Sequence, residues 1–174
     1  MHVLTRLWFV LAGGDSDELD ELARALGSRP LAALACAAEP SCRTVCAAVL
    51  ARAGPSTTDT PLEESADLGA GGQRTLTELA RLARDHADRE VLAVAPRAAL
   101  ESALRCAIGL DLQGDLPVKL RPGALFAFDW PTGQDPATRP LLLGVDLDWL
   151  PAWTRGRQHA RFPGGPGAAG TARA

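Results

Sequence analysis

Four residues of this sequence could do chemistry from the ends of predicted strands. Asp15 and Glu64 carry carboxyl groups that could transfer protons. Cys36 carries a thiol, and Arg97 carries a guanidinium group that could bind an anion or simply be solvated at a helix start. A cysteine becomes a nucleophile only beside a basic or cationic group, and the sequence identifies none for Cys36. The two acids are therefore the candidates for acid–base chemistry, although Asp15 could equally cap a helix and Glu64 could be an exposed loop acid.

The histidines and cysteines predict no metal or cofactor site. His2 precedes the first predicted strand, and His159 lies in the C-terminal stretch. His86 precedes the strand predicted at 91–95, so it is expected at the amino end of the sheet, away from the candidates. The cysteines have neither paired CxxC spacing nor a nearby histidine, so buried thiols are expected rather than zinc ligands. They are Cys36, Cys42, Cys46 and Cys106.

Strand–helix units recur along the chain and must position these candidates. Apolar, branched runs predict strands at 3–11, 31–36, 57–61, 91–95, 118–120, 124–130 and 141–147, and apolar residues at helical spacing predict helices at 17–26, 39–53, 75–86 and 98–108. This order predicts an α/β fold, a three-layer α/β/α sandwich whose central sheet is mostly parallel with antiparallel strands at an edge. The site of such a fold lies at the carboxyl ends of the strands, here the loops 11–15, 36–41 and 95–97.

Composition fits one domain. The chain has 174 residues, 47% of them hydrophobic, and we expect one globular domain over 1–152. The stretch 153–174, rich in Arg, Gly, Pro and Ala, is expected to be a disordered tail. A net charge of -3 argues against nucleic acid as a partner, and the apolar run 4–12 is too short to cross a membrane. We expect a cytoplasmic protein, and the excess of Arg over Lys suggests a GC-rich bacterial genome.

One stretch resembles a known family at its most important motif. Residues 7–13 read LWFVLAG and resemble the opening strand and Arg-His-Gly motif of the histidine phosphatase superfamily, in its phosphoglycerate-mutase-like branch. In that resemblance Leu11 stands at the arginine, and Ala12 stands at the histidine that the family phosphorylates. The resemblance therefore implies the family's α/β fold without its nucleophile.

Two further loops and the downstream turns extend the resemblance to roughly residues 3–150. Residues 34–46 are similar to the family's Ser-Ser-Pro-Leu segment, with Cys36 in the first place and Ser41 at the phosphate-binding arginine. Pro96 replaces the family's second histidine after the strand at 91–95. The turn Arg121-Pro122-Gly123 matches the family's Arg-Pro-Gly turn. The scaffold is thus kept while the phosphate-handling residues differ.

Glu64 is the residue for which the resemblance implies a surviving role. Residues 61–64, followed by Leu68-Gly69, resemble the family segment whose glutamate acts as general acid or base, with about one extra residue before the glycine. Because phosphoryl transfer relies on positioned cationic groups and a nucleophile, the loss of these groups predicts a protein without phosphatase activity.

Two functions follow from that prediction. The first is a pseudophosphatase that binds a neutral or cationic small molecule or a protein partner. The second is a biosynthetic isomerase, cyclase or dehydratase that uses Glu64 and Asp15 as acid–base groups, with a carboxyl pKa raised by neutral pocket walls. The expected pocket consists of Leu11, Ala12, Cys36, Ser41, Pro96 and Arg97. A partly emptied but active phosphatase is a third alternative, and Trp130, Trp149 and Trp153 leave a homodimer open.

Overall fold

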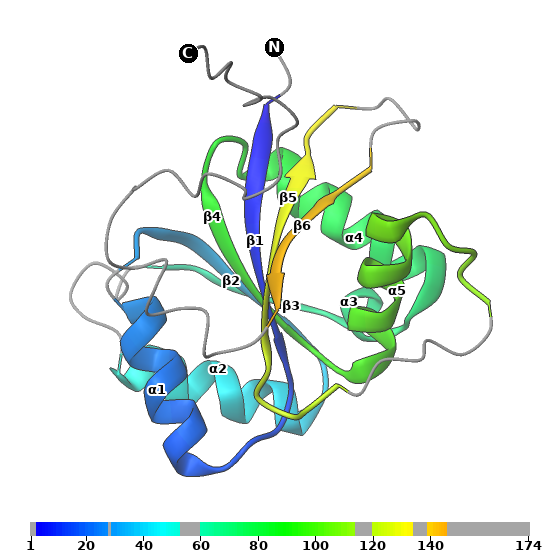
Figure 1. The fold of residues 1–174 in the computed structure, drawn as a ribbon. Coiled ribbons are helices and arrows are strands. Elements are labelled where there is room, and N and C mark those ends of the chain that lie inside the picture. The colour runs from blue at the N-terminus through cyan, green and yellow to red at the C-terminus, as the bar shows by residue number, and fades with distance from the viewer. Residues whose placement is uncertain (1–2, 28, 53–59, 114–119, 134–138, 146–174) are drawn as a thin grey trace, which may run out of the picture.

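Six strands form one sheet through the centre of the molecule, and helices cover both of its faces (Figure 1). The computed structural model describes residues 3–27, 29–52, 60–113, 120–133 and 139–145. The strands are β1 (Leu4–Leu11), β2 (Leu31–Ala37), β3 (Leu62–Ser65), β4 (Glu90–Ala95), β5 (Leu125–Pro131) and β6 (Leu141–Val145). The helices are α1 (Ser16–Gly27), α2 (Pro40–Arg52), α3 (Ala66–Gly69), α4 (Gly72–Asp85) and α5 (Arg97–Ile108).

The order of the strands is β3-β2-β4-β1-β5-β6. Neighbours among β3, β2, β4 and β1 run parallel, with Leu11 of β1 beside Ala95 of β4. β5 runs antiparallel to β1, so that Arg6 faces Asp129, and β6 runs antiparallel to β5. The predicted sheet, mostly parallel with antiparallel strands at one edge, is confirmed.

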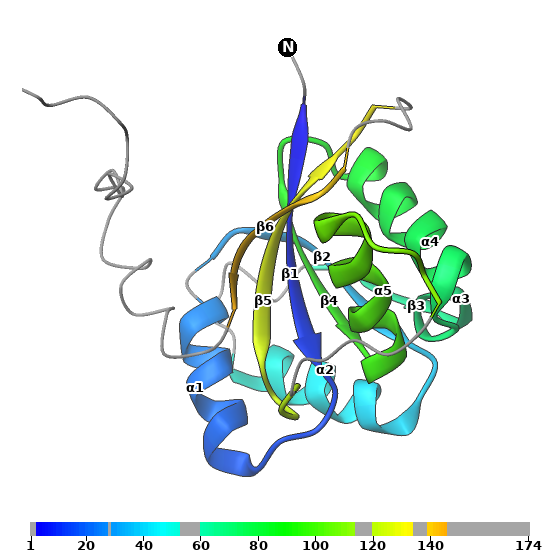
Figure 2. The ribbon, with the colours of Figure 1, turned by 45° about the vertical axis from the view of Figure 1, so that its right-hand side comes forward.

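Helices on the two faces complete the predicted three-layer α/β/α fold. α1 packs against α2 on one face, while α4 packs against α5 on the other with α3 beside them (Figure 2). Burial on both faces explains why β1 has an almost unbroken apolar run, in which Trp8 and Phe9 are fully buried. On α2 the buried side chains are the four that helical spacing placed on one face, namely Cys42, Val45, Cys46 and Val49.

Two edge elements differ from their predicted positions. A strand was expected at 57–61, of which 57–59 lie outside the described residues, but β3 begins at Leu62. Its sequence LEES has no buried side chain, because an edge strand exposed to solvent does not need an apolar face. The strand expected at 118–120 is described only at Leu120, which is not in a strand. The expected boundary at 152 and the tail at 153–174 also lie outside the described part.

None of the helices in the described ranges is both long enough and apolar enough to cross a bilayer.

Candidate functional site

The carboxyl ends of β1, β2 and β4 meet at one edge of the sheet. The backbone N–H of Ala12 donates to the Ala95 carbonyl over 3.0 Å, and the N–H of Gly123 donates to the Leu11 carbonyl over 2.9 Å. Gly69, at the end of α3, lies close to the ends of both β2 and β4. A Cβ added to Gly69 would lie 3.1 Å from Cβ of Ala37, the last residue of β2, and 3.8 Å from Cγ of Pro96, which follows β4. The loops that the sequence singled out are therefore brought together, with the turn at 121–123 beside them.

Two glycines after β1 let this turn approach closely. Gly13 has φ +114°, and a Cβ on it would lie 2.8 Å from Pro122 Cβ. Gly14 has φ +104°, and a Cβ on it would lie 3.4 Å from Gly123 Cα. Side chains would therefore be strained at both positions by the backbone conformation and would also crowd the turn.

Three helices begin at this same edge. α1 follows β1, α2 follows β2 and α5 follows β4, so the positive ends of three helix dipoles point toward the strand ends. Asp15 accepts from the backbone N–H groups of Asp17 (3.0 Å) and Glu18 (2.9 Å), and the Glu18 carboxylate accepts from the N–H of Asp15 (3.2 Å). Asp15 therefore caps α1, which the sequence offered as the alternative to an acid–base role for this residue.

The residues expected to line a pocket differ in exposure. Leu11 and Cys36 are buried, and Ala12 and Pro96 are half-buried. Ser41 is exposed in the first turn of α2. Arg97 is exposed in the first turn of α5, where its Nε lies 2.6 Å from Oε1 of Glu101.

Glu64 is held by an ion pair that the sequence did not predict. Arg43 of α2 donates two hydrogen bonds to it, over 2.8 Å from Nε to Oε2 and 2.5 Å from Nη2 to Oε1. These bonds hold the pKa of Glu64 below its ordinary value. The expectation of a raised carboxyl pKa is therefore wrong for Glu64, because its environment is cationic rather than neutral.

The cysteine thiols near the edge are not activated. Burial raises the pKa of Cys36, and it raises that of Cys42 to about 11. Burial likewise raises the pKa of Cys46, which exchanges a hydrogen bond with Cys36. All four cysteines of the chain are free. The burial of Cys36 and its raised pKa agree with its interpretation as a packed thiol rather than a nucleophile.

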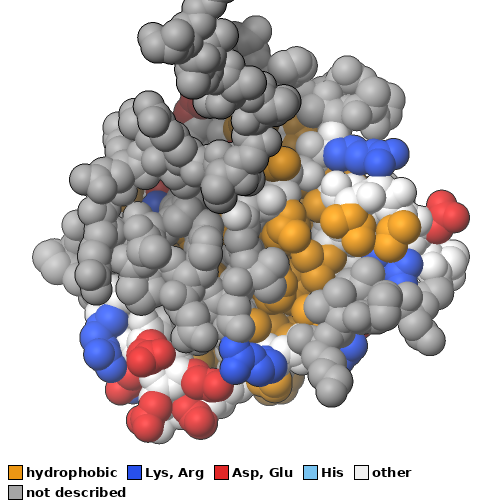
Figure 3. Space-filling model, in the orientation of Figure 1, with side chains coloured by type: hydrophobic (Ala, Val, Ile, Leu, Met, Phe, Trp, Pro, Cys, Tyr) orange, Lys and Arg blue, Asp and Glu red, His pale blue; other side chains and the backbone are white. Residues whose placement is uncertain are grey.

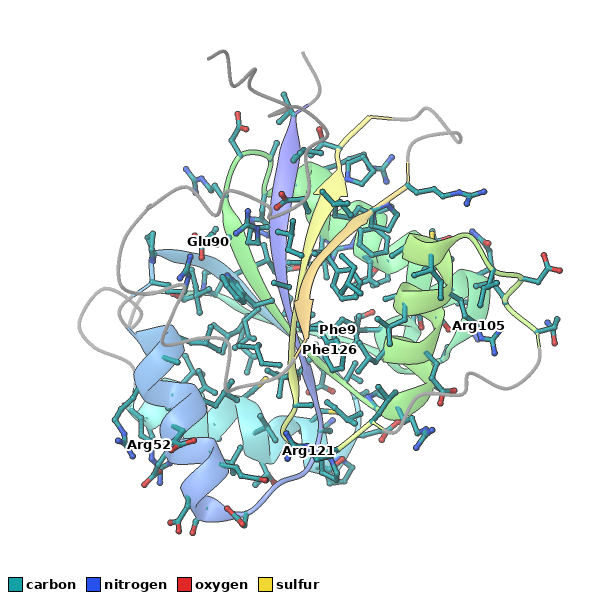
Figure 4. The ribbon with its side chains drawn as sticks, in the orientation of Figure 1. Phe9, Arg52, Glu90, Arg105, Arg121 and Phe126 are labelled. Carbon is teal, nitrogen blue, oxygen red and sulfur yellow. The ribbon has the colours of Figure 1, made fainter. Side chains whose placement is uncertain are left out.

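Two charged residues at the carboxyl ends of the strands, Arg121 and Glu39, were not predicted from the sequence to be site residues. Figure 4 shows Arg121 beside the end of β1, in the turn that packs on Gly13. Oε1 of Glu39 would lie 3.5 Å from a Cβ at Gly69, so this side chain reaches toward the gap between β2 and α3. Glu39 follows a buried strand, as Asp15 does, so its position in the sequence could have predicted that it lies at the carboxyl ends of the strands.

The opposite end of the sheet holds the described histidine. His86 follows α4, and its carbonyl accepts from Thr5 Oγ1, near the start of β1, over 3.1 Å. Its position at the amino end is as predicted, with Nε2 3.1 Å from Oε1 of Glu63. Across the described ranges, no group of three His, Cys, Asp or Glu side chains could hold a metal ion.

Comparison with known proteins identifies the fold. No protein-family model and no curated protein matches the sequence. Among solved structures, YhfR of Bacillus stearothermophilus matches with a TM-score of 0.62 at 13% identity, over 78% of this chain and 94% of that one. The alpha-ribazole phosphatase of Shigella flexneri gives 0.62 at 14% identity, over 81% and 96%. Phosphoglycerate mutase of Plasmodium falciparum gives 0.57 at 9% identity, over 81% and 89%.

These neighbours contradict the predicted loss of phosphatase activity and, with it, both the pseudophosphatase and the biosynthetic alternative. The similar structures include those of phosphatases and a mutase, and nothing in the described part of this structure shows that activity has been lost. Four changed side chains do not empty the site, because the amino termini of α2 and α5 remain at the edge together with Arg97 and Arg121. The chain has the α/β fold of the histidine phosphatases and phosphoglycerate mutases.

Proposed function

We propose that this chain is a phosphatase that binds a phosphate monoester at the carboxyl edge of its sheet. The observation that carries the proposal is the convergence of the α2 and α5 amino termini there, on a fold that it has in common with phosphatases and mutases, whereas the amino terminus of α1 is capped by Asp15. Helix amino termini favour anions because their first N–H groups are unpaired and their dipoles are positive at that end. Arg97 and Arg121 add cationic groups at the same edge.

The proposed reaction uses water as the nucleophile, since position 12 after β1 is alanine. The water oxygen forms a bond to phosphorus, the bond from phosphorus to the ester oxygen breaks, and the alcohol leaves with a proton. Glu64 accepts the proton lost by the water, and solvent returns a proton to the leaving oxygen. Stabilisation of charge on the phosphoryl oxygens by helix termini and arginines supplies the rate enhancement.

Asp15 has a different proposed role. Oδ1 of its carboxylate accepts from two backbone N–H groups of α1, so Asp15 fixes the start of this helix. Asp15→Asn would keep an oxygen that accepts these bonds and should therefore retain most of the activity, whereas Asp15→Ala should not.

The test is release of inorganic phosphate from p-nitrophenyl phosphate by the full chain. Arg97→Ala and Arg121→Ala should each lower kcat/KM by about tenfold or more, because each removes a cation that would bind the phosphate. Arg84→Ala is the matched control, since Arg84 is exposed in the last turn of α4. If phosphate release matches the buffer blank, or is equal in all four proteins, the proposal fails. Equal release would identify a contaminating phosphatase.

The proposal also includes the cellular setting. A cytoplasmic location is supported by four free cysteines, because thiols persist in reducing compartments, and a bacterial source by the excess of Arg over Lys. The proposed ligand is a phosphorylated small molecule, and a net charge of -3 gives no general attraction to nucleic acid.

A further inference from the structure

The two outermost strands of the sheet, β3 and β6, differ in charge. At one edge, Glu63 and Glu64 of β3 form ion pairs with Arg81 and Arg43, and charged side chains protect an edge strand from adding another strand. At the other edge, β6 reads LLLGV and carries no charge. In the described part of the chain, no strand pairs with the outer side of β6.

An apolar surface lies next to β6. The side chains of Ile108, Leu110 and Leu141 are 55%, 49% and 60% exposed, which makes them three of the most exposed large apolar residues described. α5 packs against β6, and Figure 3 shows hydrophobic side chains gathered over these two elements. Large exposed apolar residues that cluster in this way are typical of interaction surfaces.

The same surface contains a projection and a hollow. Leu141 projects from the start of β6. At the end of α5, an open hollow of about 250 Å³ is lined by residues that include Leu76, Cys106, Leu110 and Leu112. Arg139 and Asp111, which have opposite charges, also line it. In a two-fold symmetric pair, each projection can meet the hollow of the other copy and each charge the opposite charge of the other copy.

We propose that this surface, formed by Ile108, Leu110, Leu141 and the hollow, is the interface of a two-fold symmetric homodimer. Leu141 of each copy enters the hollow of the other, and Arg139 of each copy faces Asp111 of the other. Side-chain packing carries the contact rather than a continuous sheet. The pairing of Ala127 with Gly144 and of Phe128 with Leu142 leaves Leu143 as an extra residue, and such a bulge twists an edge strand away from regular pairing.

The mass of the full chain in solution tests this interface. Light scattering after size exclusion, over a dilution series, should give twice the 18.2 kDa of one chain at high concentration. Leu141→Glu and Leu110→Glu should each raise the dimer dissociation constant on the order of 100-fold, because each buries a charge at the centre of the contact. Leu62→Glu is the matched control, since Leu62 is 50% exposed at the opposite edge of the sheet, and it should remain dimeric.

Other outcomes would overturn the proposal. Both variants should melt within a few degrees of the unchanged chain, because the replaced side chains are exposed, so loss of the dimer would not reflect unfolding. A single-chain mass at the highest concentration would mean that the surface is covered by another protein or by this chain's own residues. A Leu141→Glu chain that dimerises as well as the unchanged chain would place the interface elsewhere. None of these results depends on phosphatase activity.

Discussion

Arg29 and Glu90 form a two-point ion pair beside the ring of a buried tryptophan. Arg29 donates from Nε to Oε2 over 2.6 Å and from Nη2 to Oε1 over 3.0 Å, and its guanidinium carbon lies 4.4 Å from the centre of the Trp8 ring. Trp8 Nε1 donates to the same Oε2 over 2.8 Å. Figure 4 shows Glu90 at the end of the sheet opposite to Arg121. This cluster joins β1, β4 and the start of β2 at the amino end.

Removing one partner of this pair should destabilise the fold. Glu90→Gln is expected to lower the free energy of unfolding by about 2 kcal/mol, because a partly buried guanidinium loses its charged partner. Arg74→Ala provides the control, since the pair of Arg74 with Asp67 is mostly exposed and should contribute less than about 1 kcal/mol. Urea unfolding followed by circular dichroism measures both values. Equal effects of the two changes would refute this role of Glu90.

The same carboxylate should make stability depend on pH. Burial acts to raise the pKa of Glu90, but hydrogen bonds from Arg29 and Trp8 outweigh it, so the net pKa is lowered. A lowered folded-state pKa gives stability that is complete above the ordinary value of 4.5 and is lost as pH falls through the folded pKa. Melting temperatures between neutral and acidic pH should therefore fall below about pH 4.5. The melting temperature of Glu90→Gln should fall less steeply with decreasing pH. An unchanged slope would show that the Glu90 carboxylate does not cause the pH dependence of stability.

Glu64 gives a separate pH prediction, which concerns activity and rests on the proposed phosphatase function. The pair with Arg43 lowers the pKa of Glu64, so the carboxylate needed as a base persists at acidic pH. Arg43→Gln should shift the acidic limb of the kcat/KM profile to higher pH, because the ion pair is removed, while Glu64→Gln should abolish the limb. An acidic limb that is the same in all three proteins would assign the base to another group.

Gly13 should tolerate no side chain. Gly13→Ala is expected to cost about 2 kcal/mol or more, since it combines a positive φ with a contact of 2.8 Å to Pro122. Gly133→Ala is the control, because nothing lies within 4 Å of a Cβ there, and it should change stability by less than about 0.5 kcal/mol. Thermal unfolding of both variants measures the difference. Similar stabilities would mean that the turn at 121–123 can move away from the loop.

The thiols should differ in reactivity. Cys36, Cys42 and Cys46 are buried, whereas Cys106 is only half-buried. At concentrations low enough to keep the chain monomeric, a thiol reagent such as dithiobis-nitrobenzoate should therefore label Cys106 first in the folded protein and should label the others only after denaturant is added. Mass spectrometry of the labelled peptides identifies the residue. Early labelling of Cys36 would contradict its buried, protonated state.

Local sequence patterns predicted most of the fold because burial imposes them. β1 and α2 were predictable, since a strand buried on both faces must be apolar and a helix that covers a sheet must have one apolar stripe. β3 was misplaced because an edge strand with exposed side chains imposes no such pattern. Its position depends on pairing with β2, and a single sequence does not record that pairing.

The candidate site was only partly predictable. The sequence identified the strand ends, because their location follows from the order of strands and helices. It did not identify the pairing of Arg43 with Glu64, which are 21 residues apart and meet through the packing of α2 beside β3. The pKa of Glu64 was therefore expected in the wrong direction, since the nearest charge comes from another element.

The central position of β1 has a consequence for folding. β1 lies between β4 and β5, so residues 4–11 pair with residues 90–95 and 125–131. On a ribosome, β1 emerges early but can pair with β4 only after residue 95 has been synthesised, and with β5 only after residue 131. Contacts so distant along the chain are slow to form, and unpaired apolar strands tend to aggregate in the meantime. A chain that ends before residue 125 should therefore expose β1 and depend on chaperones, because one whole side of that strand would have no partner.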